Sequence, residues 1–261
     1  MQNILETIIA KKKLEVADQK KLIPLEKLLS QERQRKHFSL KTALTKDESS
    51  GIIAEFKRKS PSKNWINEHA IATDIVPGYE KAGAAGSSIL TDNYFFGGSV
   101  KDILVAGEQV TLPILRKEFI VDSYQIIEAN KMGADAILLI AACLTPNEVE
   151  HFSQVAKEFD MDVLLEIHNQ AELHHICDTV DLVGVNNRNL KTFKTSLQNS
   201  IDLSTQIPDR FVKISESGIA DAKDIKLLKQ YGFQGFLIGE SFMKTDNPGL
   251  ACESFIKTIQ S

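Results

Sequence analysis

Short apolar runs recur along the chain from Gly51 onward, and most of them end in a charged, amide or glycine residue. Continuous apolar runs of this length are typical of strands that are buried on both faces of a parallel sheet. We therefore predict eight strands, at residues 52–57, 87–91, 112–117, 136–141, 162–167, 182–186, 211–216 and 235–239.

Amphipathic stretches lie between these runs. Residues 123–132 and 222–231 both have apolar side chains at helical spacing, and Gly133 and Gly232 follow as helix-ending residues. The predicted strands start about 20 to 35 residues apart, which is the length of a strand, a crossover helix and two loops. Eight such units predict an α/β protein with a closed (β/α)8 barrel, the TIM barrel.

The main alternative is an open, doubly wound sheet, which would need a glycine-rich turn after its first strand. After Lys57 the chain reads Arg-Lys-Ser-Pro-Ser-Lys instead, so the barrel is favoured. Residues 1–48 precede the first strand and are expected to form an N-terminal helical extension of a single barrel domain that spans residues 1–261. Its first segment, with Ile4, Leu5, Ile8 and Ile9 on one face, predicts a docked surface helix.

Polar residues at the strand ends carry the candidate chemistry. A charged side chain at the end of a buried strand is costly unless it lines a site. Because side chains alternate along a strand, such residues share a face with interior apolar ones, as Glu55 and Lys57 do with Ile53. The same alternation groups the other candidates in the barrel mouth, namely Lys117, Glu166, Asn186, Arg188 and Glu216.

Small residues follow the last two predicted strands, where barrels commonly bind phosphate. These are Ser217-Gly218 and Gly239-Glu240-Ser241. Together they predict a small phosphorylated substrate.

The composition of the chain argues against a nucleic-acid partner and a membrane span. The net charge of −4 and the pI near 5.9 argue against a nucleic-acid partner, which usually requires a basic face. No run reaches the roughly 18 to 20 apolar residues that cross a bilayer, so we expect no membrane span. Three widely spaced cysteines predict buried packing residues in a reducing, cytoplasmic compartment rather than disulfides.

Three further motifs, of histidine, lysine and phenylalanine–glycine, give weaker indications of function. His174-His175 and His168 lack zinc-site spacing and are interpreted as solvated histidines rather than metal ligands. Lys11-Lys12-Lys13 is interpreted as a solvated helix face. The run Phe95-Phe96-Gly97-Gly98-Ser99 is either a mobile aromatic cover over the site or a packed loop, and the sequence favours neither.

Seven motifs, in order across nearly the whole chain, resemble those of indole-3-glycerol phosphate synthases. They are IIAEFKRKSPS (52–62), LTDNYFFGGS (90–99), PILRKEF (113–119), LEIH (165–168), VNNRNL (185–190), SESG (215–218) and LIGES (237–241). The resemblance implies closure of the indole ring in tryptophan biosynthesis, without a metal or organic cofactor. The substrate of that family is 1-(2-carboxyphenylamino)-1-deoxyribulose 5-phosphate, and the resemblance makes other enzymes of the pathway candidate partners.

The resemblance also implies residue roles. Lys117 matches the general acid and Glu166 the general base, while Lys57 and Glu55 match a second acid–base pair whose step stays open. Further roles follow the motifs: Asn186, Glu216 and Ser217 for orienting the substrate, Ser60 and Arg188 for anchoring its anthranilate end, Phe95 and Phe119 for packing on the ring, and Gly218, Gly239 and Ser241 for the phosphate.

Two positions depart from the family pattern, with Glu118 after the acid lysine and Asn64-Trp65 in the loop after the first strand. They leave the expected reaction unchanged but put the mobility of that loop in question. Two other functions are compatible with a phosphate-binding barrel. Phosphoribosylanthranilate isomerase relies on a Cys/Asp pair, and the first strand here ends in Glu55 and Lys57. A barrel that only binds a phosphorylated metabolite would need to lack the acid–base residues, which are all present.

Overall fold

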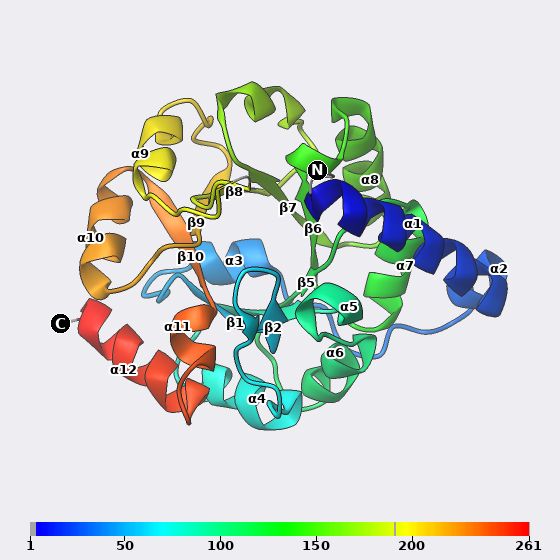
Figure 1. The fold of residues 1–261 in the computed structure, drawn as a ribbon, viewed down its shortest axis with the longest axis horizontal. Helices are drawn as coiled ribbons and strands as arrows, with labels where there is room; N and C mark the ends of the chain where they lie inside the picture. The colour runs from blue at the N-terminus through cyan, green and yellow to red at the C-terminus, as the bar shows by residue number, and fades with distance from the viewer. Residues whose placement is uncertain (1–3, 191, 261) are drawn as a thin grey trace.

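The computed structural model describes residues 4–190 and 192–260, and within them eight parallel strands close into a barrel (Figure 1). Neighbouring strands follow the order β1-β10-β9-β8-β7-β6-β5-β4 around the barrel. All eight predicted strands are confirmed, and their ends shift by no more than about two residues, the usual uncertainty of such boundaries. Their bounds are β1 (Ile52–Phe56), β4 (Gly86–Leu90), β5 (Ile114–Lys117), β6 (Ala136–Ile140), β7 (Asp162–Ile167), β8 (Leu182–Asn186), β9 (Val212–Glu216) and β10 (Phe233–Ile238).

Helices surround the barrel in the order of the chain (Figure 1). The two predicted from periodicity are α7 and α10, and the glycines after them, Gly133 and Gly232, have φ of 93° and 81°. A side chain at such a φ would be strained, which explains why glycine ends both helices. The outer helices are α4 (Ala72–Lys81), α6 (Val100–Gly107), α7 (Ser123–Lys131), α8 (Pro146–Glu158), η2 (Gln170–His175), α9 (Gln198–Ser204), α10 (Ala222–Gln230) and α12 (Pro248–Gln260).

Short elements occupy the loops. A two-stranded hairpin, β2 (Lys59–Ser60) with β3 (Asn64–Trp65), lies in the loop after β1 and was not predicted. Its short strands fall below the length at which alternation can be read from sequence. The others are α5 (Asn93–Phe96), η1 (Ala141–Cys143) and α11 (Glu240–Met243).

The core has two layers, as alternation along the strands predicts. One cluster fills the barrel interior and contains Ile53, which the sequence pattern placed on the same face as Glu55 and Lys57, together with Leu115, Leu164 and Ile214. A larger cluster lies between the sheet and the outer helices and contains the outward-facing residues of the same strands. The polar residues that follow the inner apolar ones are thereby directed into the mouth of the barrel.

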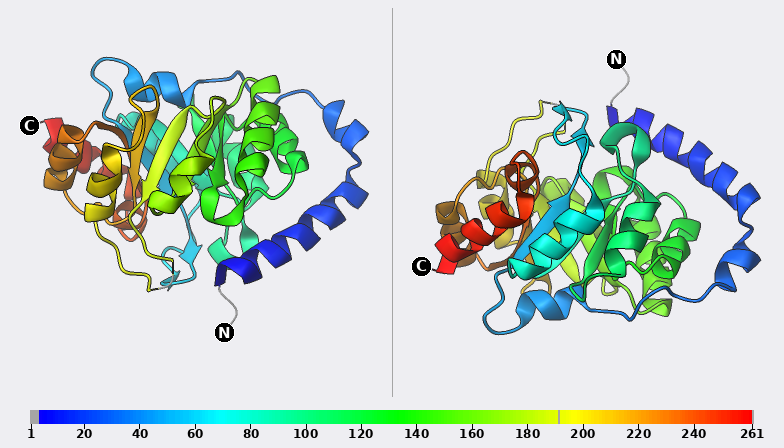
Figure 2. Two further views of the ribbon diagram at one scale, coloured as in Figure 1. Left: turned by 90° about the horizontal axis from the view of Figure 1, so that it is seen from above. Right: turned by 90° about the horizontal axis from the view of Figure 1, so that it is seen from below.

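The N-terminal extension reaches both ends of the barrel. It forms α1 (Ile4–Leu22), α2 (Leu25–Leu29) and α3 (Leu40–Thr45). Figure 2 shows α1 and α3 on opposite sides of the barrel, with the connecting segment along its outside. Leu40 and Leu44 of α3 join the interior cluster and close the end where the strands begin. Arg33 and Arg35 fix the connecting segment through ion pairs with Asp135.

Lys12 of α1 departs from the solvated face that the sequence predicted for it. It shares the buried face of the helix with Ile8 and Val16, at spacings of four residues. Its Nζ lies 2.8 Å from Asp92 Oδ2 and 3.1 Å from Glu118 Oε1, and all three side chains are buried. The prediction was wrong for Lys12 because its partners come from distant loops, which a local charge pattern does not reveal. Lys13 is exposed as predicted.

Lys12→Met is expected to destabilise the protein by about 3 kcal/mol, because breaking a buried ion pair leaves its partner charges uncompensated. The free energy of unfolding in urea measures this. Lys13→Met is the matched control and should change it by less than about 0.5 kcal/mol. A triple variant that combines Lys12→Met with Asp92→Asn and Glu118→Gln should regain part of the lost stability, because no buried charge is then left unpaired. If Lys12→Met and Lys13→Met destabilised the protein equally, the assignment of a buried ion pair to Lys12 would be wrong.

Candidate active site

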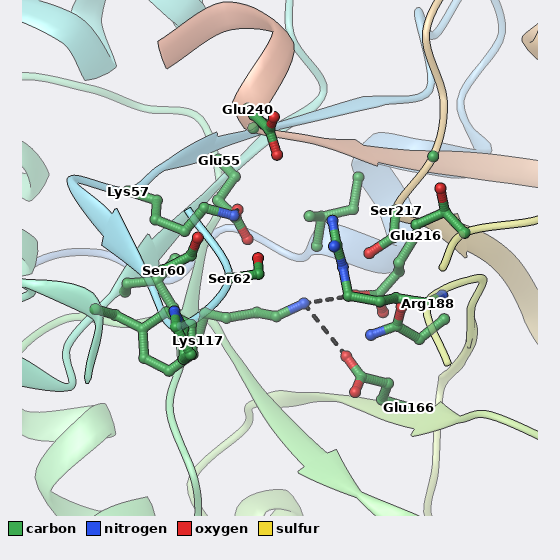
Figure 3. A pocket seen from close by; sticks show the side chains of 18 of the residues that line it. Glu55, Lys57, Ser60, Ser62, Lys117, Glu166, Arg188, Glu216, Ser217 and Glu240 are labelled. Atoms are coloured by element: carbon green, nitrogen blue, oxygen red, sulfur yellow. Dashed lines mark hydrogen bonds and ion pairs between the residues drawn. The ribbon is translucent and has the colours of Figure 1, made fainter. Parts of the chain in front are cut away.

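A cavity of about 530 Å³ opens at the carboxyl ends of the strands. Its walls carry charged or amide side chains from β1, β5, β7, β8 and β9, and Ile4, Leu5 and Ile8 of α1 line its edge. Figure 3 shows these side chains converging from different strands. The barrel therefore places polar groups from distant parts of the sequence in one enclosed space, as barrel enzymes do.

Lys117 lies at the centre of the cavity, at the end of β5 (Figure 3). Its Nζ is 2.5 Å from Glu216 Oε2 and 3.4 Å from Glu166 Oε2. Burial by itself disfavours the ammonium, but the carboxylates of Glu216, Glu166 and Glu55 outweigh it and raise the pKa of Lys117 above its ordinary value. The residue is therefore a charged proton donor at neutral pH.

Glu55 and Lys57 form a second pair beside it. The Nζ of Lys57 lies 2.5 Å from Glu55 Oε1. Burial opposes ionisation of Glu55, yet Lys57 and Lys117 together lower the pKa of its carboxyl. The arrangement confirms the predicted convergence of these two residues on the mouth.

Glu166 and Glu216 share Lys117 but differ in their other neighbours. Burial opposes the charge of Glu166, but Lys117 and His168 lower its pKa. Burial, together with the charge of Glu166, raises the pKa of Glu216 to about 7 against the opposing effect of Lys117. The two carboxyl groups thus have environments that separate their pKa values, which is the usual arrangement for dividing acid and base roles.

The prediction that His168 is a solvated histidine is wrong, because the structure buries its side chain. Only 8% of its side chain is exposed, and it lines the cavity with Nε2 3.3 Å from Glu166 Oε1. His175 is also buried, with its ring nitrogens near the carbonyls of Leu144 and Glu172, whereas His174 is exposed as predicted. Burial of His168 follows from alternation, because it lies two residues beyond Glu166. Among the described residues, no cluster of three or more His, Cys, Asp or Glu could hold a metal ion.

Two glycines make room for the buried carboxylates. A Cβ at Gly184 would lie 2.3 Å from Glu216 Oε1, and one at Gly239 would lie 2.5 Å from Glu55 Oε1. The sequence analysis gave no role to Gly184, which lies in the middle of β8. The sequence feature that could have identified it is a glycine between the two β-branched residues of that strand, because a glycine inside a strand often marks the close approach of another group.

Gly184→Ala is expected to lower kcat by about tenfold to a hundredfold, because the methyl group displaces the Glu216 carboxylate from Lys117 and small misplacements cost that much. Steady-state kinetics measure the loss. Ser87→Ala, an outward-facing substitution in β4, is the comparison for a general strand effect. Unchanged kcat in Gly184→Ala would show that the position of Glu216 does not matter.

Most of the other predicted site residues line the same cavity. These are Ser60, Phe119, Asn186, Arg188, Ser217, Gly218, Gly239 and Ser241. Ser217 and Gly218 both have positive φ, 66° and 79°, so the turn after β9 has an unusual backbone. Together with the Gly239 turn, it places small residues on one side of the cavity, as expected for a site that binds a phosphate through backbone N–H groups.

Phe95 is the exception, because it is buried outside the cavity and packs edge-on against Tyr94. Its neighbour Phe96 lines the cavity instead, with its ring centroid 5.9 Å from that of Phe119. The two residues lie on the short helix α5, so successive side chains point in different directions. The side chain of Asp92 caps this helix, and the structure therefore favours the packed-loop interpretation of the segment.

Comparison with known proteins agrees with the site. A family model described as indole-3-glycerol phosphate synthase matches residues 5–255. The indole-3-glycerol phosphate synthase of Bacteroides thetaiotaomicron is 49% identical over 261 residues, covering all of both chains. That of Verminephrobacter eiseniae is 41% identical and covers 96% of this chain and 98% of its own.

Solved structures agree on the fold alone. A tryptophan synthase α-subunit variant from Pyrococcus furiosus has a TM-score of 0.61 at 13% identity, over 81% of this chain and 98% of its own. The agreement in sequence with the two synthases extends over nearly the whole chain. The chain belongs to the indole-3-glycerol phosphate synthase family.

Proposed function

We propose that Lys117 and Glu166 are the principal acid and base of the reaction that defines this family, the conversion of 1-(2-carboxyphenylamino)-1-deoxyribulose 5-phosphate to indole-3-glycerol phosphate, CO2 and water. The single observation that supports this most is the ammonium of Lys117, buried in the cavity between two carboxylates. A charged lysine in such a place can donate a proton or stabilise a developing oxyanion.

The chemistry has three parts. The aromatic carbon that carries the carboxylate attacks the ribulose carbonyl, and Lys117 protonates the carbonyl oxygen as the new C–C bond forms. Loss of CO2 returns its bonding electrons to the ring system. The hydroxyl group then leaves as water when an acid protonates it, and a base takes a proton from the ring system to complete the indole.

Glu166 suits the role of base because the neighbouring cations favour its carboxylate form. It also carries negative charge where an iminium-like intermediate would be positive. Glu55 and Lys57, 2.5 Å apart, supply a second acid and base in the same cavity. Two acid–base pairs in one cavity fit a reaction in which the carbonyl oxygen is protonated first and the leaving hydroxyl group later.

The remaining residues bind the ends of the substrate. Gly218, Gly239 and Ser241 are proposed for the phosphate, and Arg188 with Ser60 for the anthranilate carboxylate. Phe119, with Phe96 in place of Phe95, would pack on the aromatic ring, where offset or tilted arrangements are favoured.

No helix in the described part of the chain is both long and apolar enough to cross a membrane. We propose a cytoplasmic location, supported by the three free cysteines. Contact with other enzymes of tryptophan biosynthesis is a proposal that rests on the shared pathway alone.

The test is formation of indole-3-glycerol phosphate by the purified, chelator-treated protein, followed by indole absorbance and fluorescence. We expect turnover with release of one CO2 for each indole formed. Tight substrate binding without turnover would favour a barrel that only binds its ligand. Isomerisation of phosphoribosylanthranilate instead would support the other pathway enzyme.

A further inference from the structure

His168 lies between two carboxylates at the edge of the cavity. It follows β7 and is two residues beyond Glu166, so the two side chains share the inward face. Its Nε2 is 3.3 Å from Glu166 Oε1, and its Nδ1 is 3.3 Å from Glu172 Oε2. The imidazole therefore links the cavity carboxylate to a second one on η2.

The Nδ1 of His168 is hydrogen-bonded to Glu172 Oε2, whereas the buried Nε2 makes no hydrogen bond among the described residues and meets Glu166 Oε1 only at ion-pair distance. A neutral imidazole has one N–H, and its other nitrogen would present a lone pair to a carboxylate. Glu172 cannot easily turn away, because its carboxylate also accepts hydrogen bonds from the backbone N–H of His168 at 2.7 Å and from Asn169 Nδ2 at 2.6 Å. The geometry is therefore that of an imidazolium held by an anchored anion.

This cation distinguishes Glu166 from Glu216. Lys117 lies closer to Glu216 than to Glu166, at 2.5 Å against 3.4 Å, so the lysine alone would favour ionisation of Glu216. The other oxygen of Glu216, Oε1, is buried and has no hydrogen-bond partner among the described residues. The other oxygen of Glu166 faces His168. His168 therefore gives Glu166 a cationic neighbour in addition to Lys117.

We propose that His168 is a positioning residue that keeps Glu166, rather than Glu216, as the ionised carboxylate beside Lys117. The inference rests on the proposed role of Glu166 as base. Glu172 supplies the opposing charge that holds His168 protonated, and Glu166 gains a fixed orientation as well as a cation.

The surrounding charges are consistent with this arrangement. Burial would lower the pKa of His168, but Glu166 and Glu172 outweigh it and raise the pKa to about 10. The histidine therefore stays charged through the neutral range. The titratable groups that act on Glu166 from the elements around it are Lys117 of β5, His168 after β7, Glu216 of β9, Glu55 of β1 and Cys143 of η1.

The test is His168→Gln, which keeps a donor of similar size and removes the charge. We expect kcat to fall about tenfold to a hundredfold while KM changes by less than about threefold. Without the cation the pKa of Glu166 rises, so the acidic limb of the kcat/KM profile should move to higher pH by about one unit. His174→Gln, at the exposed neighbouring histidine, is the matched control and should change none of these.

Glu172→Gln provides a second variant that does not alter the histidine itself. It removes the anion that keeps His168 protonated, so the acidic limb should shift in the same direction by a smaller amount. Nuclear magnetic resonance of the imidazole should show His168 charged from pH 6 to 8 in the wild type, and titrating at lower pH in Glu172→Gln.

Carboxyl resonances separate failure of this inference from failure of the proposed function. In the wild type, Glu166 should be ionised at pH 7 whether or not the protein turns over substrate, and in His168→Gln the proton should move from Glu216 towards Glu166. A neutral His168 at pH 7, or a His168→Gln variant with an unchanged acidic limb and an ionised Glu166, would overturn the proposal.

Discussion

Lys117→Met should lower kcat by at least about a thousandfold. Methionine has a similar volume but cannot donate a proton or stabilise an oxyanion, and each of these contributions is worth about a hundredfold or more. The substrate should still bind, because the proposed phosphate cradle and anthranilate anchors are untouched. Indole formation under saturating substrate, together with the KM, measures the effect.

The fold should survive the substitution, but with a changed response to pH. Only 14% of the Lys117 side chain is accessible, so the residue is largely buried within the barrel mouth. Without it, Glu166 and Glu216 face each other, and their folded-state pKa values rise above those of the unfolded chain. Such groups favour the folded state below the unfolded pKa and lose that contribution as pH rises through the folded pKa.

Thermal unfolding at pH 5 and pH 8 tests the expected pH dependence. Relative to the wild type, Lys117→Met should lose more stability at pH 8 than at pH 5. Lys223→Met, on the exposed face of α10, is the control for removing a lysine and should behave as the wild type at both. If Lys117→Met kept more than about a tenth of the wild-type kcat, the acid role would move to Lys57.

The barrel was predictable because its determinants are local. Each apolar run and each helix-ending glycine can be read without knowing what lies across the fold, and the connection lengths then select the βαβ unit. The inner face was equally accessible, since alternation from Ile53 to Glu55 fixes the direction of both side chains. These rules brought most of the cavity residues together correctly.

The errors have two causes, a partner that lies far away in the sequence and a local element that was not recognised. Lys12 is buried because Asp92 and Glu118 meet it from other elements, and no charge pattern within α1 announces them. Phe96 lines the cavity in place of Phe95 because adjacent side chains on a helix point in different directions, and the segment was not recognised as helical. His168 could have been assigned to the cavity, since it continues the alternation of Glu166 by one step.

Glu166→Gln is the second substitution with a large expected effect, a fall in kcat of about a hundredfold to ten-thousandfold. The amide keeps the shape of the side chain but cannot accept a proton. The surrounding cations keep partners, because Lys117 stays 2.5 Å from Glu216 and His168 stays beside Glu172. The variant should therefore fold normally and bind substrate with a KM within about threefold of the wild type.

Comparison with Glu216→Gln decides which carboxylate is the base. Glu216 lies closer to Lys117, and proximity alone would make it the ionised partner, but burial and the charge of Glu166 raise its pKa to about 7. The carboxylate of Glu216 is engaged with the proposed acid, Lys117, at 2.5 Å, whereas Glu166 lies 3.4 Å from it and is freer to accept a proton from the substrate. We therefore expect Glu166→Gln to lose at least about tenfold more activity than Glu216→Gln at pH 7.5, with Glu158→Gln on the exposed face of α8 as the control. The reverse order would assign the base to Glu216 and leave Glu166 to position the lysine.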